Sequence, residues 1–249
     1  MELVRGVAAG PSICVFGAGN GSDLDLAELC AIFDEVHLID LDGAALVRAK
    51  SQVAPELGER IIVHAARDLS GFLDHLDDWG DQFPEETELG RQAVAAAHAI
   101  VRGVGRTFDV VLSTCVLSQL IVPYYRAWIT SRSNWERLTA AIDAVHLATL
   151  AASTRSGGRA VMAFDVLSSN DAPALADQRD QTEAQLQDWV DRAAGEGNLT
   201  LRPNPATLIE QLRSPGLASL VRSPRLTPPW LWNLGDATQL VYGLLFERP

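Results

Sequence analysis

The chain has 249 residues, of which 47% are hydrophobic and 21% are charged, and its formal net charge is -12. This composition is typical of a globular chain long enough for one α/β domain with a substantial core. Because phosphate backbones and anionic lipids attract basic surfaces, the negative charge argues against a nucleic-acid or membrane partner. We see no leader segment and no apolar run of the ~18 residues that a membrane span needs. Three cysteines without metal-ligand spacing predict no metal site and favour the cytoplasm.

The first structural signal is an apolar segment, 12–16, that runs into a glycine-rich turn. Its sequence, SICVF, predicts a short strand buried on both faces, and Gly17, Gly19 and Gly21 follow at alternate positions. Glycine allows a positive φ and lets a ligand approach the backbone closely. Beyond the turn, Ser22 and Asp25 have the spacing of a capping box in front of a helical apolar stripe. Strand, glycine turn and helix N-terminus together favour nucleotide binding.

A second predicted strand, 35–40, ends in Asp40, which lies 21 positions after Gly19. A nucleotide-binding unit carries an acid at about this distance, where the carboxylate accepts hydrogen bonds from ribose hydroxyls. Asp42, just beyond, is expected to cap the next helix. Later strands are predicted at 60–66, 107–114, 159–165 and 237–247, and Trp230 and Trp232 lie in a possible antiparallel strand that serves as core or cover.

The alternation of strands and helices predicts a doubly wound α/β fold. We expect a mostly parallel seven-stranded sheet with helices on both faces and an antiparallel C-terminal strand, in a single domain over residues 1–249. Helices are predicted at 86–102, 134–152, 172–194 and 208–220. The irregular connections near 71–105 and 166–232 are long enough to cover a substrate. Since parallel strands end at one edge of the sheet, Gly17, Asp40, Asp68 and Cys115 should converge there.

Five segments between Ile13 and Asp165 follow one another in the chain: VFGAGNGSDLDL, HLIDLDGAAL, HAARDLSGF, FDVVLSTCVLSQL and GGRAVMAFD. This ordered set resembles the class I (Rossmann-like) S-adenosylmethionine-dependent methyltransferases. The resemblance implies S-adenosylmethionine as cofactor and in-line methyl transfer to a small molecule or a protein side chain. It also implies the cofactor-binding residues Gly17, Ala18, Gly19, Asn20, Gly21, Asp40, Leu41, Asp68, Leu69, Thr114 and Cys115.

Each of these positions has a role in the resemblance. The glycine turn would pass under the methionine part of the cofactor, and Asp40 would hold both ribose hydroxyls. Leu41 would pack on the adenine, Asp68 would accept from the adenine amino group, and the N–H of Leu69 would reach the ring. Backbone carbonyls around Thr114 and Cys115 would face the amino group or the methyl donor. The family usually carries an acid two residues before the first glycine, and Val15 stands there in this chain.

Other positions are left with open roles. Asp23 or Asp25 could replace the acid missing at Val15, or could simply favour a helix N-terminus. Candidates for the substrate pocket are Gln119, Tyr124, Tyr125 and Asp165, and no catalytic residue can be assigned. His37 and His64 are expected to be hydrogen-bonded core histidines.

Two alternatives stand beside methyl transfer. The first is an NAD-dependent oxidoreductase, but Ser22 occupies the sixth position of the Gly-x-Gly-x-x-Gly pattern. Lys50 is the only lysine, so no Tyr-x-x-x-Lys pair can form. The second is an interaction module that keeps the fold, and the cofactor, without turnover.

Overall fold

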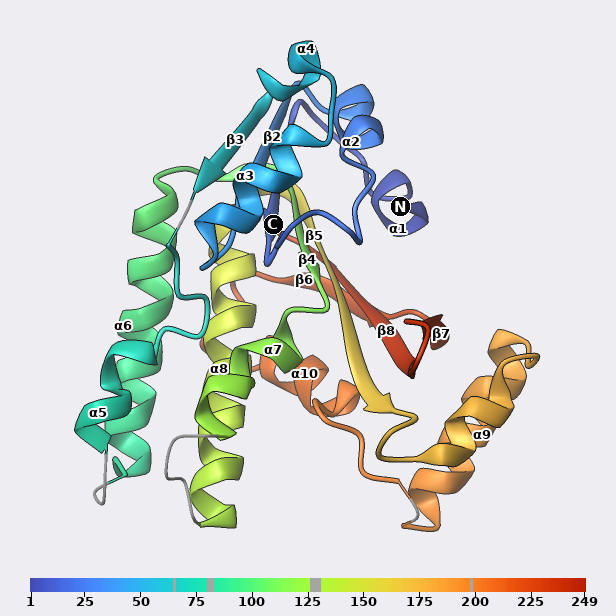
Figure 1. Cartoon of the computed structure of the whole chain (residues 1–249). Helices are drawn as coiled ribbons and strands as arrows, with labels where there is room; N and C mark the ends of the chain where they lie inside the picture. The colour runs from blue at the N-terminus through green and yellow to red at the C-terminus, as the bar shows by residue number, and fades with distance from the viewer. Residues whose placement is uncertain (65, 80–82, 126–130, 198) are drawn as a thin grey trace.

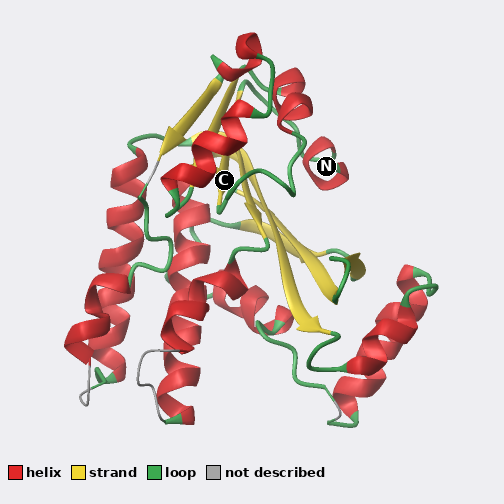
Figure 2. Cartoon of the chain, viewed as in Figure 1, coloured by secondary structure: helices red, strands yellow, loops and turns green. Residues whose placement is uncertain are grey.

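The structure is a computed structural model that describes residues 1–64, 66–79, 83–125, 131–197 and 199–249, without the side chains of residues 77, 78 and 125. The described residues form a central sheet with helices on both faces (Figures 1 and 2). The doubly wound α/β fold predicted from the sequence is therefore confirmed.

The sheet has eight strands in the described part of the chain, one more than predicted. They are β1 (Ser12–Phe16), β2 (Glu35–Ile39), β3 (Ile61–His64), β4 (Phe108–Thr114), β5 (Thr154–Ser168), β6 (Arg222–Leu226), β7 (Trp230–Asn233) and β8 (Thr238–Glu247). Their order is β3-β2-β1-β4-β5-β8-β6, with β7 paired to β8. The first five strands pair in parallel, and β8 runs antiparallel to β5, as predicted for the C-terminal strand.

The additional strand arises because the segment before β8 is divided in two. Strand β6 pairs with the end of β8 at Leu244–Glu247, and β7 pairs with its beginning at Thr238–Val241. Between them lie Pro228 and Pro229, which have no N–H to donate to a neighbouring strand. The tryptophans of this segment, Trp230 and Trp232, lie in an antiparallel strand as expected.

Strand β1 shows why its sequence is apolar at every position. Ile13 and Val15 belong to one hydrophobic core cluster, whereas Cys14 and Phe16 belong to the other. Successive side chains of a strand point to opposite faces, so a strand covered on both sides needs an apolar residue at each position. Val15, at the position where the resemblance implies an acid, is fully buried.

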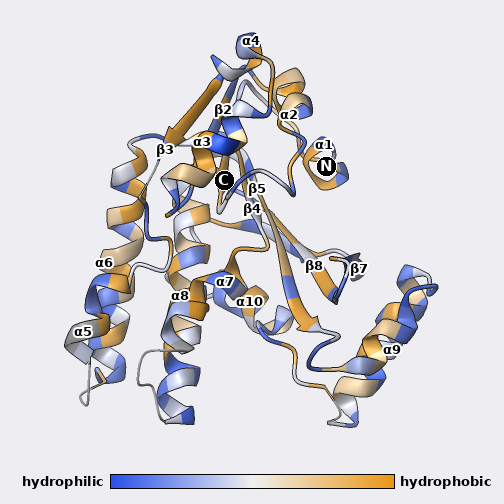
Figure 3. Cartoon of the chain, in the orientation of Figure 1, coloured by the Kyte–Doolittle hydropathy of each residue, from blue (hydrophilic) through white to orange (hydrophobic). Residues whose placement is uncertain are grey.

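Each core cluster is covered by its own helices. One face carries α1 (Glu2–Arg5), α2 (Leu26–Ile32), α3 (Gly43–Ser51) and α4 (Pro55–Gly58). The other carries η1 (Leu73–His75), α5 (Leu76–Trp79), α6 (Glu86–Val104), α7 (Leu117–Tyr125), α8 (Arg132–Ser153), η2 (Pro173–Gln178), α9 (Glu183–Gly195) and α10 (Pro205–Leu212). In Figure 3, most of β3 is hydrophobic, while α9 alternates between hydrophilic and hydrophobic residues. None of the described helices is sufficiently long and apolar to pass through a bilayer.

Several predicted boundaries are wrong. Strand β3 is shorter than predicted and ends at His64, with Ala65 outside the described residues, and β5 is longer at both ends. The helix predicted at 172–194 is divided into η2 and α9, because Thr182 forms a capping box with Gln185 that begins a new helix. The helix predicted at 208–220 is α10, which starts after the cap Asn204 and ends at Leu212.

The capping box predicted at Ser22 is also wrong. Helix α2 is capped by Asp25, whose carboxylate accepts a hydrogen bond from the N–H of Glu28 at 2.8 Å. The hydroxyl of Ser22 donates instead to Oδ1 of Asn20 at 2.7 Å. The polar side chains after the glycine turn therefore shape the loop first and cap the helix three residues later. In contrast, Asp42 caps α3 as predicted, accepting from the N–H of Ala45.

The histidines of the core are hydrogen-bonded. Nδ1 of His37 lies 2.9 Å from Nε2 of His64, as expected for core histidines. His146, on α8, is fully buried, and its Nε2 lies 2.8 Å from Oγ of Ser113 on β4. Burial lowers the pKa of His146 from 6.5 to about 4, since the charged imidazolium would lose its hydration. The pKa of His37 is also lowered to about 4, first by burial and then by nearby positive charges.

These shifts predict a loss of stability in acid. The unfolded chain binds a proton at His146 below pH 6.5, whereas the folded chain does so only near pH 4, so unfolding becomes easier as the pH falls through this window. Between pH 7.5 and pH 5, His146 alone should remove roughly 2 kcal/mol from the free energy of unfolding. Urea titrations at both pH values should show a smaller difference for His146→Gln than for the unchanged protein.

Two comparisons control this measurement. His98 is exposed on α6, so His98→Gln should leave the pH difference unchanged. Asp143 acts in the opposite direction, because burial raises its pKa to about 7, but it is common to all three proteins and cancels. Equal pH differences for the unchanged protein and His146→Gln would contradict the assignment of the effect to His146.

Candidate functional site

The glycine turn is bound to the end of the neighbouring strand. The N–H groups of Gly17 and Ala18 both donate to the carbonyl of Ile39, at 2.9 and 3.2 Å, and the N–H of Gly21 donates back to the carbonyl of Ala18 at 2.9 Å. Gly17, Gly19 and Gly21 all have positive φ, a conformation that glycine adopts without steric cost. The turn after β1 is thus fixed against β2.

The three glycines meet different surroundings. A Cβ on Gly17 would lie 2.4 Å from Val116, and one on Gly21 would lie 3.2 Å from Ala49. A Cβ on Gly19 would meet no atom within 4 Å. Packing therefore requires a glycine at position 17 and leaves little room for a side chain at position 21, whereas the middle glycine presents its backbone to open space. This open side is what a nucleotide-binding turn needs for close approach of a ligand.

Asp40 joins the glycine turn to the second strand. Its Oδ2 accepts a hydrogen bond from the N–H of Gly19 at 2.9 Å, and its Oδ1 accepts one from the N–H of Asp42, also at 2.9 Å. Each carboxylate oxygen can accept a further hydrogen bond. The side chain is half-buried and held in one orientation, with accepting capacity left for a ligand.

A cavity of about 280 Å³ brings the predicted adenosine-binding residues together. It is lined by Asp40, Leu41, Asp68 and Leu69, together with Val116 and Gln119. Leu41 is 53% exposed, which is unusual for a leucine beside a buried strand and leaves an apolar surface for a flat ring to cover. The convergence of the β2 and β3 ends, predicted from parallel strand geometry, is therefore present in the structure.

The carboxylate of Asp68 is already hydrogen-bonded within its own loop. Oδ1 accepts from the N–H and the hydroxyl of Ser70, at 2.8 and 2.5 Å, and Oδ2 accepts from the N–H of Leu73 at 2.9 Å. The hydroxyl of Ser70 also lies 2.7 Å from that of Tyr124. Asp68 thus shapes the cavity wall, and one acceptor position, on Oδ2, is left for a ligand.

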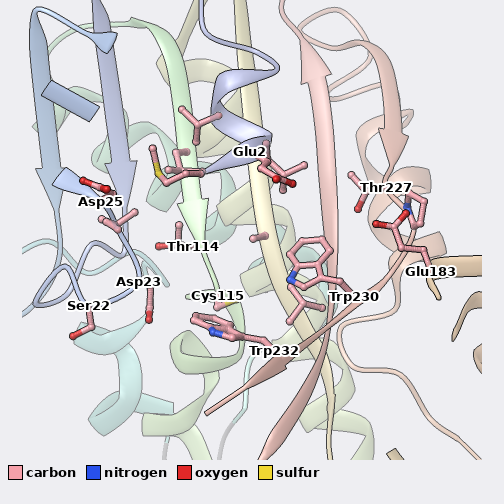
Figure 4. Close-up of a pocket in the computed structure, with 18 residues that line it drawn as sticks. Glu2, Ser22, Asp23, Asp25, Thr114, Cys115, Glu183, Thr227, Trp230 and Trp232 are labelled. Carbon is pink, nitrogen blue, oxygen red and sulfur yellow. The ribbon is translucent and has the colours of Figure 1, made fainter. Parts of the chain in front are cut away.

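A larger cavity, of about 1000 Å³, lies over the ends of β4 and β5 (Figure 4). Its floor is formed by side chains from the strands, which are Leu112, Thr114, Ala163, Val241, Trp230 and Trp232. Its walls come from α1, from the loop 22–25, from Glu183 at the start of α9 and from Thr227 and Pro228. This cavity contains Thr114 and Cys115, the two predicted residues that follow the fourth strand.

Cys115 has an unusual backbone conformation. Its φ is +44°, which is uncommon for a residue other than glycine, and its N–H donates to the carbonyl of Ala163 at 2.8 Å. Burial, followed by the carboxylates of Asp165 and Asp23, raises the pKa of the thiol to about 12. A protonated thiol is a poor nucleophile, so the contribution of Cys115 to the site comes from its backbone.

Cys115 and the next residue, Val116, separate the two cavities. Cys115 lines the larger cavity and Val116 lines the smaller one, where Val116 also lies against Gly17. Nε2 of Gln119 donates to the carbonyl of Cys115 at 3.1 Å and so holds this part of the chain in place. The beginning of α7 is therefore the boundary between the two parts of the site.

The predicted substrate residues are dispersed. Gln119 lines the smaller cavity rather than the larger one, and the structure places Tyr124 in the core with its hydroxyl bonded to Ser70. The side chain of Tyr125 lies outside the described residues. Asp165 is half-buried and accepts a hydrogen bond from the hydroxyl of Ser118 at 2.8 Å. Burial raises the pKa of Asp165, which lies close enough to Cys115 to affect its thiol.

Sequence reasoning missed other residues of the larger cavity. Glu2 and Glu183 line it from helices that are far apart in the chain. Asp23, which the sequence had suggested as a replacement for the acid missing at Val15, lines it from the loop after the glycine turn. Burial raises the pKa of Asp23, and its carboxylate has no hydrogen-bond or ion-pair partner among the described residues. No group of three or more His, Cys, Asp or Glu suited to a metal ion occurs in the part of the chain that the structure describes.

The described residues have a doubly wound α/β fold, with a mostly parallel sheet and an antiparallel C-terminal strand. No protein-family model and no curated protein matches the chain. Among solved structures, it is similar to the methyltransferase domain of a bacterial Hen1, CtHen1-CN, with 12% identity, a TM-score of 0.48 and coverage of 99% of this chain and 94% of that one. It is also similar to a TehB-like SAM-dependent methyltransferase from Corynebacterium glutamicum, with 13% identity, a TM-score of 0.44 and coverage of 99% and 85%.

A third similarity is to the glycopeptide N-methyltransferase MtfA, solved in complex with S-adenosylmethionine. It has 12% identity and a TM-score of 0.37, over 67% of this chain and 52% of that one, so the chain matches about half the length of MtfA. These similarities concern the fold, and the chemistry of this chain has to be argued from its own residues.

Proposed function

We propose that the chain binds S-adenosylmethionine and transfers its methyl group to a small molecule or a protein side chain. The observation that carries the proposal is the hydrogen bond from the N–H of Gly19 to Asp40, which joins the open glycine to the predicted ribose acceptor. Asp40, Leu41, Asp68 and Leu69 line one cavity beside this bond. Adenosine recognition requires three groups: a polar group for the ribose, an exposed apolar surface and a nearby carboxylate.

In this proposal the two cavities hold different parts of the cofactor. Adenosine occupies the smaller cavity, with the ribose at Asp40 and the adenine against Leu41. The methionine part passes Gly19 towards Thr114 and Cys115 in the larger cavity. Asp23 lines that cavity without a partner and near Cys115, so it is suited to receive the amino group for which Val15 supplies no acid.

When bound, the cofactor supplies a methyl group activated by a positively charged sulfur. A lone pair of the acceptor forms the new bond to the methyl carbon, and the electrons of the breaking carbon–sulfur bond remain on sulfur. The chain's part is to hold the acceptor in line and to exclude water. The segments 71–105 and 166–232 are proposed as the cover, with Leu73 at the smaller cavity and Glu183, Thr227, Trp230 and Trp232 at the larger one.

Ligand-induced stabilisation tests the cofactor. S-adenosylmethionine and S-adenosylhomocysteine should raise the melting temperature, because a ligand that binds only the folded chain stabilises it by about 2.7 kcal/mol at 100 times its Kd. NAD should leave the melting temperature unchanged, since the glycine spacing is not that of a dinucleotide site. A rise with NAD alone would overturn the proposal.

Transfer itself needs a separate assay. Mass spectrometry after incubation with S-adenosylmethionine and a panel of amines, phenols, carboxylates and peptides should show an acceptor heavier by one methylene. Cofactor binding without transfer to any member of a broad panel would favour the non-catalytic module instead.

A further inference from the structure

At the end away from the glycine turn, the larger cavity is lined by tryptophan and acidic side chains. Trp230 and Trp232 both line it, because residues two apart on β7 point to the same side of the strand. Figure 4 shows their indole rings extending from β7 towards the side on which Thr114 and Cys115 lie. Both tryptophans are only partly buried, so the rings are available to a ligand.

The charged groups around this cavity are mostly acidic. Glu2, Asp23, Asp25 and Glu183 line it, whereas no described Lys, Arg or His side chain does, and the α-amino group of Met1 is the one basic group. Asp25 is occupied by capping α2. Glu2 and Glu183 have no hydrogen-bond or ion-pair partner among the described residues. A cleft lined by one sign of charge concentrates ligands of the opposite sign.

The floor between these groups is apolar. Ala163 on β5 and Val241 on β8 contribute to it, and the side chains of Thr227 and Leu3 cover Gly243, the residue opposite Ala163 in the antiparallel pair. In strand order, β7 is separated from β4 by β5 and β8. The backbone of β7 therefore lies apart from Thr114, and Figure 4 shows Glu183 beside Thr227, on the side away from Asp23, where the methionine part of the cofactor is proposed to lie.

We infer that this end of the cavity binds a methyl acceptor that carries a positively charged amine on a flat apolar body. The indole faces attract a cation through their quadrupole, Glu183 and Glu2 supply the opposite charge, and Ala163 and Val241 accept the apolar body. The inference rests on the proposed function and names its substrate class. An anionic acceptor would meet repulsion at Glu2 and Glu183, and a neutral one would gain nothing from them.

Three probes with the same indole body separate these classes: tryptamine, which is a cation, tryptophol, which is neutral, and indole-3-acetate, which is an anion. Calorimetry with the full chain, with and without saturating S-adenosylhomocysteine, should show tryptamine binding at least about tenfold more tightly than tryptophol. Indole-3-acetate should show no binding. Equal affinities, tighter binding of the neutral or anionic probe, or no binding of any probe would overturn the inference.

Matched variants locate the effect. Glu183→Gln and Trp230→Leu should each weaken tryptamine by about tenfold and leave S-adenosylhomocysteine binding unchanged. Asp188→Asn removes the same charge from an exposed position of α9 that does not line the cavity, and should change neither. An unchanged tryptamine affinity in Glu183→Gln and Trp230→Leu would contradict the binding of tryptamine at this end of the cavity. Loss of S-adenosylhomocysteine binding with tryptamine binding retained would count against the proposed cofactor and not against the acceptor.

Discussion

Replacing Asp40 by alanine is expected to weaken S-adenosylhomocysteine binding by at least about 100-fold, because it removes the proposed acceptor for two ribose hydroxyls and each such charge-assisted hydrogen bond contributes about 1.5–3 kcal/mol. The change also leaves the N–H of Gly19 without its acceptor, while the bonds of Gly17 and Ala18 to Ile39 remain. Calorimetric titration of the variant with S-adenosylhomocysteine measures the loss directly.

Asp42→Ala is the matched control for this prediction. Asp42 is a carboxylate two residues further on that lines the same cavity, and its side chain caps α3. Its removal should lower the free energy of unfolding by about 1 kcal/mol through loss of the cap, but should change ligand affinity only slightly. If both variants lost affinity equally, the effect would come from the general negative charge of the cavity, and the specific role of Asp40 would be refuted.

Replacing Gly17 by alanine is expected to lower the free energy of unfolding by about 2–5 kcal/mol. The new methyl group would lie 2.4 Å from Val116, and the backbone at this position has a φ of +73° that alanine adopts only with strain. Because Val116 is one of the two residues that separate the cavities, the affinity for the ligand should fall as well. Urea unfolding measures the first effect, and titration with S-adenosylhomocysteine measures the second.

The Gly19→Ala variant distinguishes the cost of backbone strain from the cost of a steric contact with Val116. Gly19 also has a positive φ, +51°, but a Cβ there meets no atom within 4 Å. Its cost should therefore be limited to the backbone term of about 1–2 kcal/mol. Should Gly17→Ala and Gly19→Ala destabilise the chain equally, contact with Val116 would not be what requires a glycine at position 17.

The proposed cofactor half of the site could be predicted because its residues follow consecutive strands. Parallel strands end at one edge of the sheet, so the segments after β1, β2 and β3 had to meet once the alternation of strands and helices was recognised. The distance in sequence between Gly19 and Asp40 marked the pair, and the structure joins them by a hydrogen bond. The C-terminal strand was predicted from a different signal, a long apolar segment after the last helix.

The acceptor half could not be predicted from spacing. Glu2, Glu183 and Trp230 come from α1, α9 and β7, which are widely separated in the chain, and they line one cavity only in the folded structure. No periodicity connects them. Local hydrogen bonding overturned one prediction, because Ser22 binds Asn20 in place of a helix N-terminus. Short polar side chains satisfy the nearest backbone group, and a spacing rule does not distinguish that choice.

The division of the segment before β8 into β6 and β7 has a consequence for how this chain can change over generations. Strand β7 is attached to the rest of the sheet through β8 alone, whereas β1 and β4 lie at its centre. Residues on β7 and in the turn before it can therefore be exchanged without disturbing the strands that carry the glycine turn and Asp40. The proposed cofactor site and β7 thus lie on different strands of the sheet. Substitutions on β7 could change the methyl acceptor while the proposed cofactor site stays the same.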